Sequence, residues 1–197
     1  MRIEREQVLL SRGSASQDPS VLTALAEIRN GIAAVVWPRR SKSFAIRPVR
    51  QGNGVTPIKA RCMAHLKASG WELERRMALA QGAGPGPIDA VKKLDSGRLF
   101  AVEWETGNIS SSHRALNKLL VGLQERVLDG GALILPTRAL YKYLTDRVGN
   151  YEELEPYFSV WDRPDVQGML IVIAVQHDEL RNNVPRIRKG TDGRALG

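Results

Sequence analysis

The chain contains one cysteine and has no long hydrophobic run. Its single cysteine, Cys62, excludes an internal disulfide and a cysteine-based zinc cluster. No apolar stretch approaches the roughly 18 residues of a membrane span, and Glu4 and Glu6 stand where a signal peptide would have its apolar stretch. These absences predict an intracellular, cytoplasmic protein. Its hydrophobic content of 43% is ordinary for a globular fold.

The motifs of several enzyme classes are also missing. His65, His113 and His177 are scattered, without the spacing of metal ligands. No Gly-x-Ser-x-Gly elbow or Cys–His pair suggests acyl chemistry. The glycine-rich loop at residues 81–87 lacks the Gly-Lys-Ser/Thr of a phosphate-binding loop. It more simply allows a turn before the following strand.

Positive charge is abundant and unevenly placed. The net charge is +8, and ten Lys or Arg residues against two acids fall between Pro38 and Arg76. A second basic group forms a C-terminal tail: Arg181, Arg186, Arg188, Lys189 and Arg194. Such asymmetry is typical of nucleic-acid binding. A basic surface kept for solubility, or attraction to acidic lipids, is the alternative.

The length of 197 residues fits a single domain, 1–197. We divide it into an N-terminal helical and basic segment (1–70), a core (71–177) and a basic tail (178–197). Asp18-Pro19 favours a helix start, with a cap and a proline at the first position, and this helix should end near Asn30-Gly31. A second helix is expected at 59–68 and a strand from 71 to 75.

The second half of the chain alternates between helical and strand patterns. Leucines at helical spacing after residue 113 predict a helix that ends at Gly130-Gly131. Buried strands are expected at 132–136 and 169–175, with a helix between them that is capped by Thr137 and closes near Gly149, and a further short helix at 150–158. A strand–helix–strand order predicts parallel pairing. The fold class is therefore α/β, with a mixed central sheet flanked by helices on both faces.

A β-hairpin is predicted between these halves. Apolar residues flank Asp95-Ser96-Gly97, and a turn signal between two strand-like runs favours a hairpin. If the three residues form the loop with Gly97 left-handed, Leu94 pairs with Arg98. The hairpin then fixes which residues face each other further along the two strands.

This register gathers acidic side chains on one surface. Asp89 falls opposite Glu103, with Cβ atoms about 5 Å apart, and Glu105 shares the face of Glu103 because strand side chains alternate. Clustered carboxylates suit Mg²⁺. The alternative is that Glu103 and Glu105 form the solvated face of an edge strand.

These residues resemble a known family. Ile88-Asp89, the run Val102 to Asn108 and the strand Gly131 to Pro136 are similar to type II restriction endonucleases of the BglII and BamHI kind. The resemblance covers roughly residues 71–175 and implies the PD-(D/E)xK nuclease core. Ile88 stands where the motif has proline. Glu105 occupies the lysine position, as a glutamate does in enzymes of the BamHI kind.

The resemblance also implies roles for the acids. Asp89 and Glu103 would bind Mg²⁺, with Trp104 between the glutamates as a further metal position, although its indole should point to the opposite face. Glu105 would act as general base or support a second metal. A fourth, upstream acid often completes such a site. Glu72 and Glu74 are the candidates, and we prefer Glu74. A charged strand face paired with neighbouring arginines is the alternative.

The helix that follows the acids is a candidate DNA contact. Its serines could simply cap the helix, but a helix N-terminus also attracts phosphate and short polar side chains can contact base edges. The residues predicted to contact DNA are Asn108, Ser110, Ser111, Ser112, His113 and Arg114, with Arg138 and Lys142 after the next strand.

Taken together, the sequence predicts a Mg²⁺-dependent type II restriction endonuclease. It should cut double-stranded DNA as a homodimer at a short palindromic site, as one part of a restriction–modification system. Two alternatives stay open. One is a repair or structure-selective nuclease with the same core, and the other is a DNA-binding protein without catalytic activity.

Overall fold

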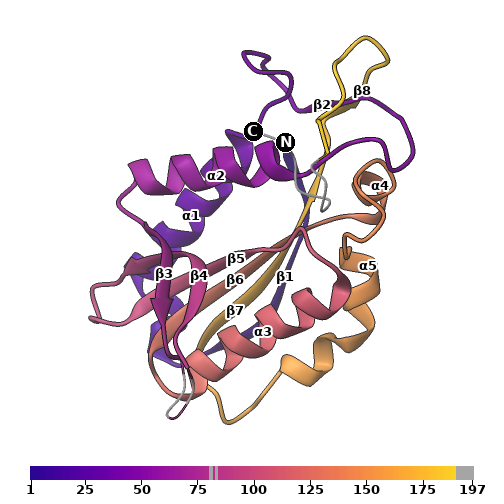
Figure 1. The fold of residues 1–197 in the computed structure, drawn as a ribbon. Helices are drawn as coiled ribbons and strands as arrows, with labels where there is room; N and C mark the ends of the chain where they lie inside the picture. Colours follow the sequence, from indigo (N-terminus) through magenta and orange to yellow (C-terminus); the bar gives the residue numbers. More distant parts are fainter. Residues whose placement is uncertain (80–81, 83, 190–197) are drawn as a thin grey trace.

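The fold is built on one mixed β-sheet of six strands, in the order β1-β7-β6-β5-β4-β3 (Figure 1). The computed structural model describes residues 1–79, 82 and 84–189. β5, β6 and β7 are parallel, whereas β1, β4 and β3 are antiparallel to their neighbours. The strands are β1 (Arg2–Arg12), β3 (Glu72–Met77), β4 (Gly86–Lys93), β5 (Leu99–Trp104), β6 (Leu128–Pro136) and β7 (Gly168–Gln176). This arrangement confirms the predicted α/β class and the parallel pairing of β6 with β7.

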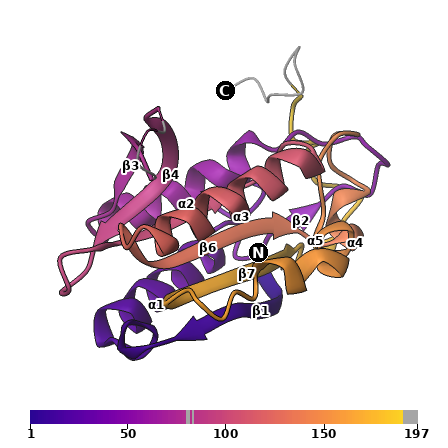
Figure 2. The same ribbon diagram turned by 90° about the horizontal axis from the view of Figure 1, so that it is seen from below.

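Helices cover both faces of the sheet. α1 (Pro19–Ala33) and α2 (Thr56–Ala68) pack on one face against Phe100 and Val102. α3 (Ile109–Gln124) packs on the other face against Leu99 and Ala101, beside α5 (Tyr151–Leu154) and the 3₁₀ helix η2 (Glu155–Trp161) (Figure 2). Alternate residues of β5 thus enter two separate cores, as the period of two in a strand requires.

The predicted caps Asp18 and Thr137 are confirmed, whereas α3 is capped by Asn108 and not by a serine. The side chain of Asp18 accepts a hydrogen bond from the Ser20 amide at the start of α1, where Pro19 fills the first position. Asn108 caps α3 through the Ser111 amide. Thr137 caps α4 (Arg138–Tyr141) through the Leu140 amide. α4 is only four residues long, however, so the helix predicted to run to Gly149 is wrong beyond Tyr141.

Two strands differ from expectation. β1 lies in the N-terminal segment that we expected to be helical and basic, and it pairs with β7 at the sheet edge. β6 begins at Leu128, so Gly130 lies in a strand and does not end the helix, which stops at Gln124. A Cβ at Gly130 would lie 2.3 Å from the Phe100 ring. The glycine therefore permits close packing of two neighbouring strands.

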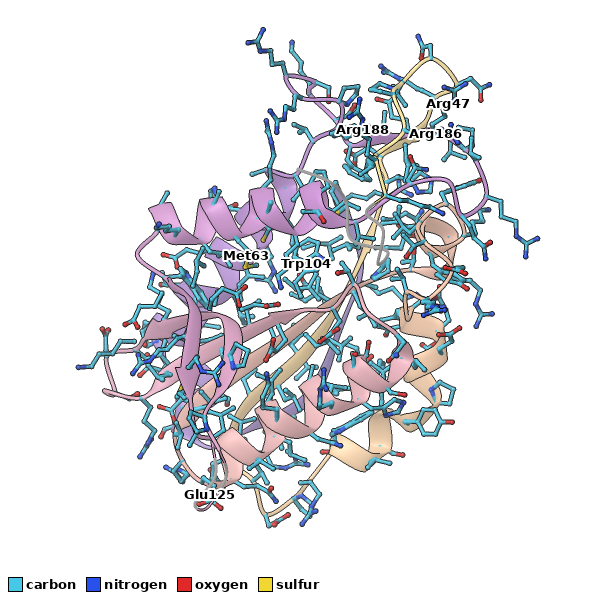
Figure 3. The ribbon with its side chains drawn as sticks, in the orientation of Figure 1. Arg47, Met63, Trp104, Glu125, Arg186 and Arg188 are labelled. Carbon is cyan, nitrogen blue, oxygen red and sulfur yellow. The ribbon has the colours of Figure 1, made fainter. Side chains whose placement is uncertain are left out.

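A small two-stranded sheet stands apart from the main one. β2 (Ala45–Ile46) pairs in parallel with β8 (Glu179–Leu180). Elsewhere, the short 3₁₀ helix η1 (Ser14–Gln17) follows β1. Arg47, Arg186 and Arg188 gather around this small sheet, at the end of the molecule beyond α2 (Figure 3). The two basic segments that the sequence separates are therefore neighbours in space. No helix in the described part of the chain is long and apolar enough to cross a membrane.

Candidate active site

The hairpin of β4 and β5 brings Asp89 and Glu103 together. The Leu94 amide donates to the Arg98 carbonyl at 2.8 Å, and Gly97 has a φ of +83°, so the predicted loop is confirmed. Cross-strand pairs run from Lys93–Leu99 to Ala90–Val102. Continuing this register by one step sets Asp89 across from Glu103.

The backbone pairing of β4 with β5 ends at Ala90–Val102. Beyond it, the Asp89 side chain accepts the hydrogen bond of the next free amide on β5. Asp89 Oδ2 accepts a hydrogen bond of 2.7 Å from the Trp104 amide. The Trp104 indole is 3% exposed and packs with the core beneath α2, near Met63 (Figure 3). Only the backbone of Trp104 therefore faces the acids, and its carbonyl is the one oxygen it could offer to a metal.

Glu103 points to the face of the sheet opposite to Trp104 and is buried there against α3. Its side chain is 6% exposed and forms an ion pair with Lys118 of α3. Burial raises the pKa of Glu103 to about 7, although the charge of Lys118 opposes this and the nearby Asp89 and Glu105 carboxylates add to it. The strand is thus no solvated edge, as β6 covers its other side. The alternative of a surface acid pair is wrong for Glu103.

Glu105 follows directly after β5 and stays beside the other two acids. Its amide donates to the Ile134 carbonyl at 2.9 Å, which holds this residue against β6. Burial and the Asp89 charge raise its pKa, while a backbone hydrogen bond from Gly107 and the positive charges of Lys59 and Arg114 oppose the rise. A carboxylate with a raised pKa is a better proton acceptor near neutral pH.

Two lysines that the sequence analysis missed hold these acids. Lys59 of α2 places its ammonium nitrogen 2.5 Å from Asp89 Oδ1, and Lys118 of α3 pairs with Glu103 from the other face. Lys118 follows Arg114 by four residues on α3, so helical spacing could have placed both on one side of that helix. No comparable signal links Lys59 to Asp89.

Glu74 stands near Asp89 on the neighbouring strand. The pairs Leu73–Ala90 and Arg75–Ile88 set Glu74 across from Asp89. Glu74 has a φ of +51°, a conformation that non-glycine residues rarely adopt, and it lines a cleft of about 320 Å³ with Lys59 and Thr106. Glu72 instead pairs with Arg75 on the surface. These positions support the preference for Glu74 over Glu72.

The donor set suits a hard divalent cation, although the acids of the described residues do not form a complete set of ligands. Within the described residues, no three His, Cys, Asp or Glu side chains lie close enough to hold an ion by themselves. The carboxylates of Asp89 and Glu103 are each matched by a lysine ammonium instead. Buried acids that each engage a positive charge fit a site where a cation is required.

The predicted DNA contacts at the start of α3 separate into three groups. Ser110 and Arg114 are exposed, Asn108 and Ser111 form the cap, and the charge of Arg114 reaches Glu105. The side chain of Ser112 is fully buried and cannot reach DNA from this position. The prediction that Ser112 contacts DNA is therefore wrong.

His113 and the later basic residues have other surroundings. The His113 ring packs against Tyr157 and Trp161 of η2, at centroid distances of 5.0 and 5.5 Å. This contact accounts for His113 without DNA. Arg138 and Lys142 are exposed on and after α4, and their contact with DNA remains a prediction.

Comparisons with known proteins agree on one family. The model of the family described as restriction endonuclease BamHI matches residues 1–194. The type II restriction enzyme OkrAI of Oceanobacter kriegii is 52% identical over 197 residues, which cover 100% of both chains. The type II restriction enzyme BamHI of Bacillus amyloliquefaciens is 37% identical over 201 residues, covering 98% of this chain and 92% of its own.

A solved structure is also similar in part. The restriction endonuclease BglII, in complex with a DNA 16-mer, aligns with 61% of this chain and 55% of its own at 13% identity and a TM-score of 0.43. The full-length match to the family model and to two type II restriction enzymes carries the assignment. The chain belongs to the BamHI family of type II restriction endonucleases and is a site-specific deoxyribonuclease.

Proposed function

We propose that this protein cuts duplex DNA at a short palindromic sequence, as a homodimer that requires Mg²⁺. The observation that carries this proposal is the grouping of Asp89, Glu103 and Glu105 where the pairing of β4 with β5 ends, each beside a positive side chain. Carboxylate oxygens suit hard divalent ions such as Mg²⁺, Ca²⁺ and Mn²⁺, and of these we propose Mg²⁺.

Each acid has a distinct task in this proposal. Asp89 and Glu103 hold the ion, which when bound supplies the positive charge that stabilises the developing charge on the leaving oxygen. Glu105, whose pKa is raised, accepts the proton of the attacking water. Glu74 lines the cleft from the neighbouring strand β3 and helps to position the acids of the site.

DNA approaches from the end of the sheet where α3 begins. The N-terminus of α3 lies directly after Glu105, and its exposed Ser110 and Arg114 face solvent there. The basic side chains around β2 and β8 of the same subunit would contact the sugar–phosphate backbone of the DNA (Figure 3). Phosphate contacts of this kind position the protein, while base contacts give the sequence preference.

The homodimer follows from the symmetry of a palindrome. A twofold axis in the DNA is matched by a twofold axis in the protein, so each subunit cuts one strand. Tyr157 and Val160 of η2 are 51% and 61% exposed. Large apolar side chains at such exposure suit a protein interface.

Digestion of a plasmid of known sequence tests the function. With Mg²⁺ the wild-type protein should give discrete fragments, and EDTA should abolish them. A smear would favour a nuclease that recognises DNA structure, and an intact but gel-retarded plasmid would favour a binding protein.

Two variants locate the site within the same assay. Asp89→Ala and Glu103→Ala should stop cleavage and still bind DNA in Ca²⁺, since they remove ion ligands rather than DNA contacts. The matched control is Glu72→Ala on the exposed strand face, which should cut as the wild type does. Wild-type cutting by either site variant would show that the acids are structural.

A further inference from the structure

Lys59 occupies the place at Asp89 that an ion would need. Its ammonium nitrogen lies 2.5 Å from Asp89 Oδ1, and Asp89 Oδ2 already accepts the Trp104 amide at 2.7 Å. Both oxygens of this carboxylate are therefore engaged by groups of the protein itself. An ion that binds Asp89 must compete with Lys59 for Oδ1.

Lys59 and Lys118 are about equally exposed, and they differ in what holds them. The Lys59 side chain is 29% exposed and lines the cleft of about 320 Å³ that Glu74 and Thr106 also line, and the Lys118 side chain is 31% exposed. A lysine carries its charge on a flexible stem of four carbons. Lys118 pairs with Glu103 and also donates to the Pro87 carbonyl at 2.9 Å, so it is fixed from two sides.

The charges of the site favour an exchange over a simple addition. The carboxylates of Asp89, Glu103 and Glu105 lie near three cations, Lys59, Lys118 and Arg114. A divalent ion that leaves Lys59 in place adds two positive charges to this group. An ion that displaces Lys59 adds only one.

We propose that Lys59 is a placeholder for the divalent ion. Its ammonium neutralises Asp89 in the metal-free protein and moves out into the cleft when the ion binds. The placeholder also shields DNA phosphates from the acids before the ion arrives. This inference rests on the proposed function, because it takes Asp89 as an ion ligand.

Calorimetric titration with Ca²⁺ in the absence of DNA tests the competition. Lys59→Met should bind Ca²⁺ about three- to tenfold more tightly, since partly exposed ion pairs contribute modestly. Lys59→Arg should bind Ca²⁺ more weakly, because a guanidinium grips a carboxylate with two hydrogen bonds. An unchanged affinity in both variants would overturn the proposal.

Lys92→Met is the matched control for these variants. Lys92 lies on the same strand as Asp89 and pairs with both oxygens of Glu27 at 2.5 and 2.6 Å. Its exposed fraction of 22% is close to that of Lys59. Loss of this lysine should leave Ca²⁺ affinity unchanged. An equal gain in affinity for Lys92→Met would mean that overall charge, and not displacement, causes the effect.

Lysine side-chain NMR on the wild-type protein follows the movement without any substitution. The ammonium signal of Lys59, protected by its ion pair, should disappear when Ca²⁺ saturates the site, while the signals of Lys118 and Lys92 persist. A Lys59 signal that is unchanged at saturation overturns the proposal, even if the Lys59 variants do not fold.

DNA binding gives an independent readout. In EDTA, Lys59→Met should bind DNA about tenfold more weakly, since the uncovered Asp89 repels phosphate, and Ca²⁺ should restore wild-type affinity. Equal affinities of Lys59→Met and the wild type for DNA in EDTA would contradict the shielding.

Asp89→Asn distinguishes a failure of the metal assignment from a failure of the placeholder role of Lys59. If it binds Ca²⁺ as the wild type does, the metal assignment itself fails. If it loses Ca²⁺ while Lys59→Met is unchanged, only the placeholder fails.

Discussion

Glu103 couples the stability of this protein to pH. Its side chain is 6% exposed, and burial raises its pKa from 4.5 to about 7 despite the ion pair with Lys118. In the unfolded chain the same group is hydrated, and its pKa returns to the ordinary value of 4.5. The metal-free folded protein therefore holds this proton more tightly than the unfolded chain does.

The stabilisation from this proton is present at low pH and lost at high pH. Because the folded pKa lies above the unfolded value, the contribution is complete below about pH 4.5 and disappears as pH rises through about 7. A difference of roughly 2.5 pKa units corresponds to about 3 kcal/mol. For a chain of this length, that free energy shifts the melting temperature by roughly 6–12 °C.

Glu103→Gln isolates this contribution, because the amide has the shape of the acid but does not titrate. Melting temperatures measured in EDTA from pH 5 to pH 8 should show the variant gaining on the wild type as pH rises, and the gap should level off above pH 7. Glu72→Gln, at an exposed acid, should stay parallel to the wild type. Parallel curves for Glu103→Gln and the wild type would refute the electrostatic reasoning.

Three further variants test the surface and the interior. Arg39→Ala and Arg40→Ala, at exposed positions of the basic segment, should weaken DNA binding and each lower the slope of log affinity against log salt by about one if it removes a phosphate contact. An unchanged slope would exclude these arginines from the interface. Ser112→Ala should be neutral or stabilising by up to about 1 kcal/mol in urea unfolding, since its buried hydroxyl has no hydrogen-bond partner among the described residues. A loss of cleavage in Ser112→Ala would return this serine to the DNA contacts.

The hairpin was predictable because its signals are local. Asp95-Ser96-Gly97 sets the turn, Gly97 adopts the left-handed conformation and the register follows by counting to Asp89 and Glu103. Alternation along β5 also placed Trp104 in the core. Turn chemistry and side-chain period act within about ten residues, so one sequence contains all the information they need.

The parts that were missed depend on distant contacts. β1 pairs with β7 from the far end of the chain, and most of its residues are not buried, so no alternating pattern marks it. Lys59 meets Asp89 across 30 residues, and only the packing of α2 on the sheet brings them together. α4 stops at Tyr141 although its sequence continues to favour a helix. Tertiary contacts decide each of these outcomes.

Glu105 stands where the nuclease motif that this sequence resembles has a lysine, and this explains why Lys59 and Lys118 are needed at the site. With Glu105 in place of a lysine, β5 and the residue that follows it supply two acids and no positive charge to the site. A buried carboxylate without a cation is costly, so the positive charge has to come from other elements. α2 supplies Lys59 and α3 supplies Lys118, one from each face of the sheet. The helices that enclose the sheet therefore also set its electrostatics, and the strand motif by itself does not describe the site.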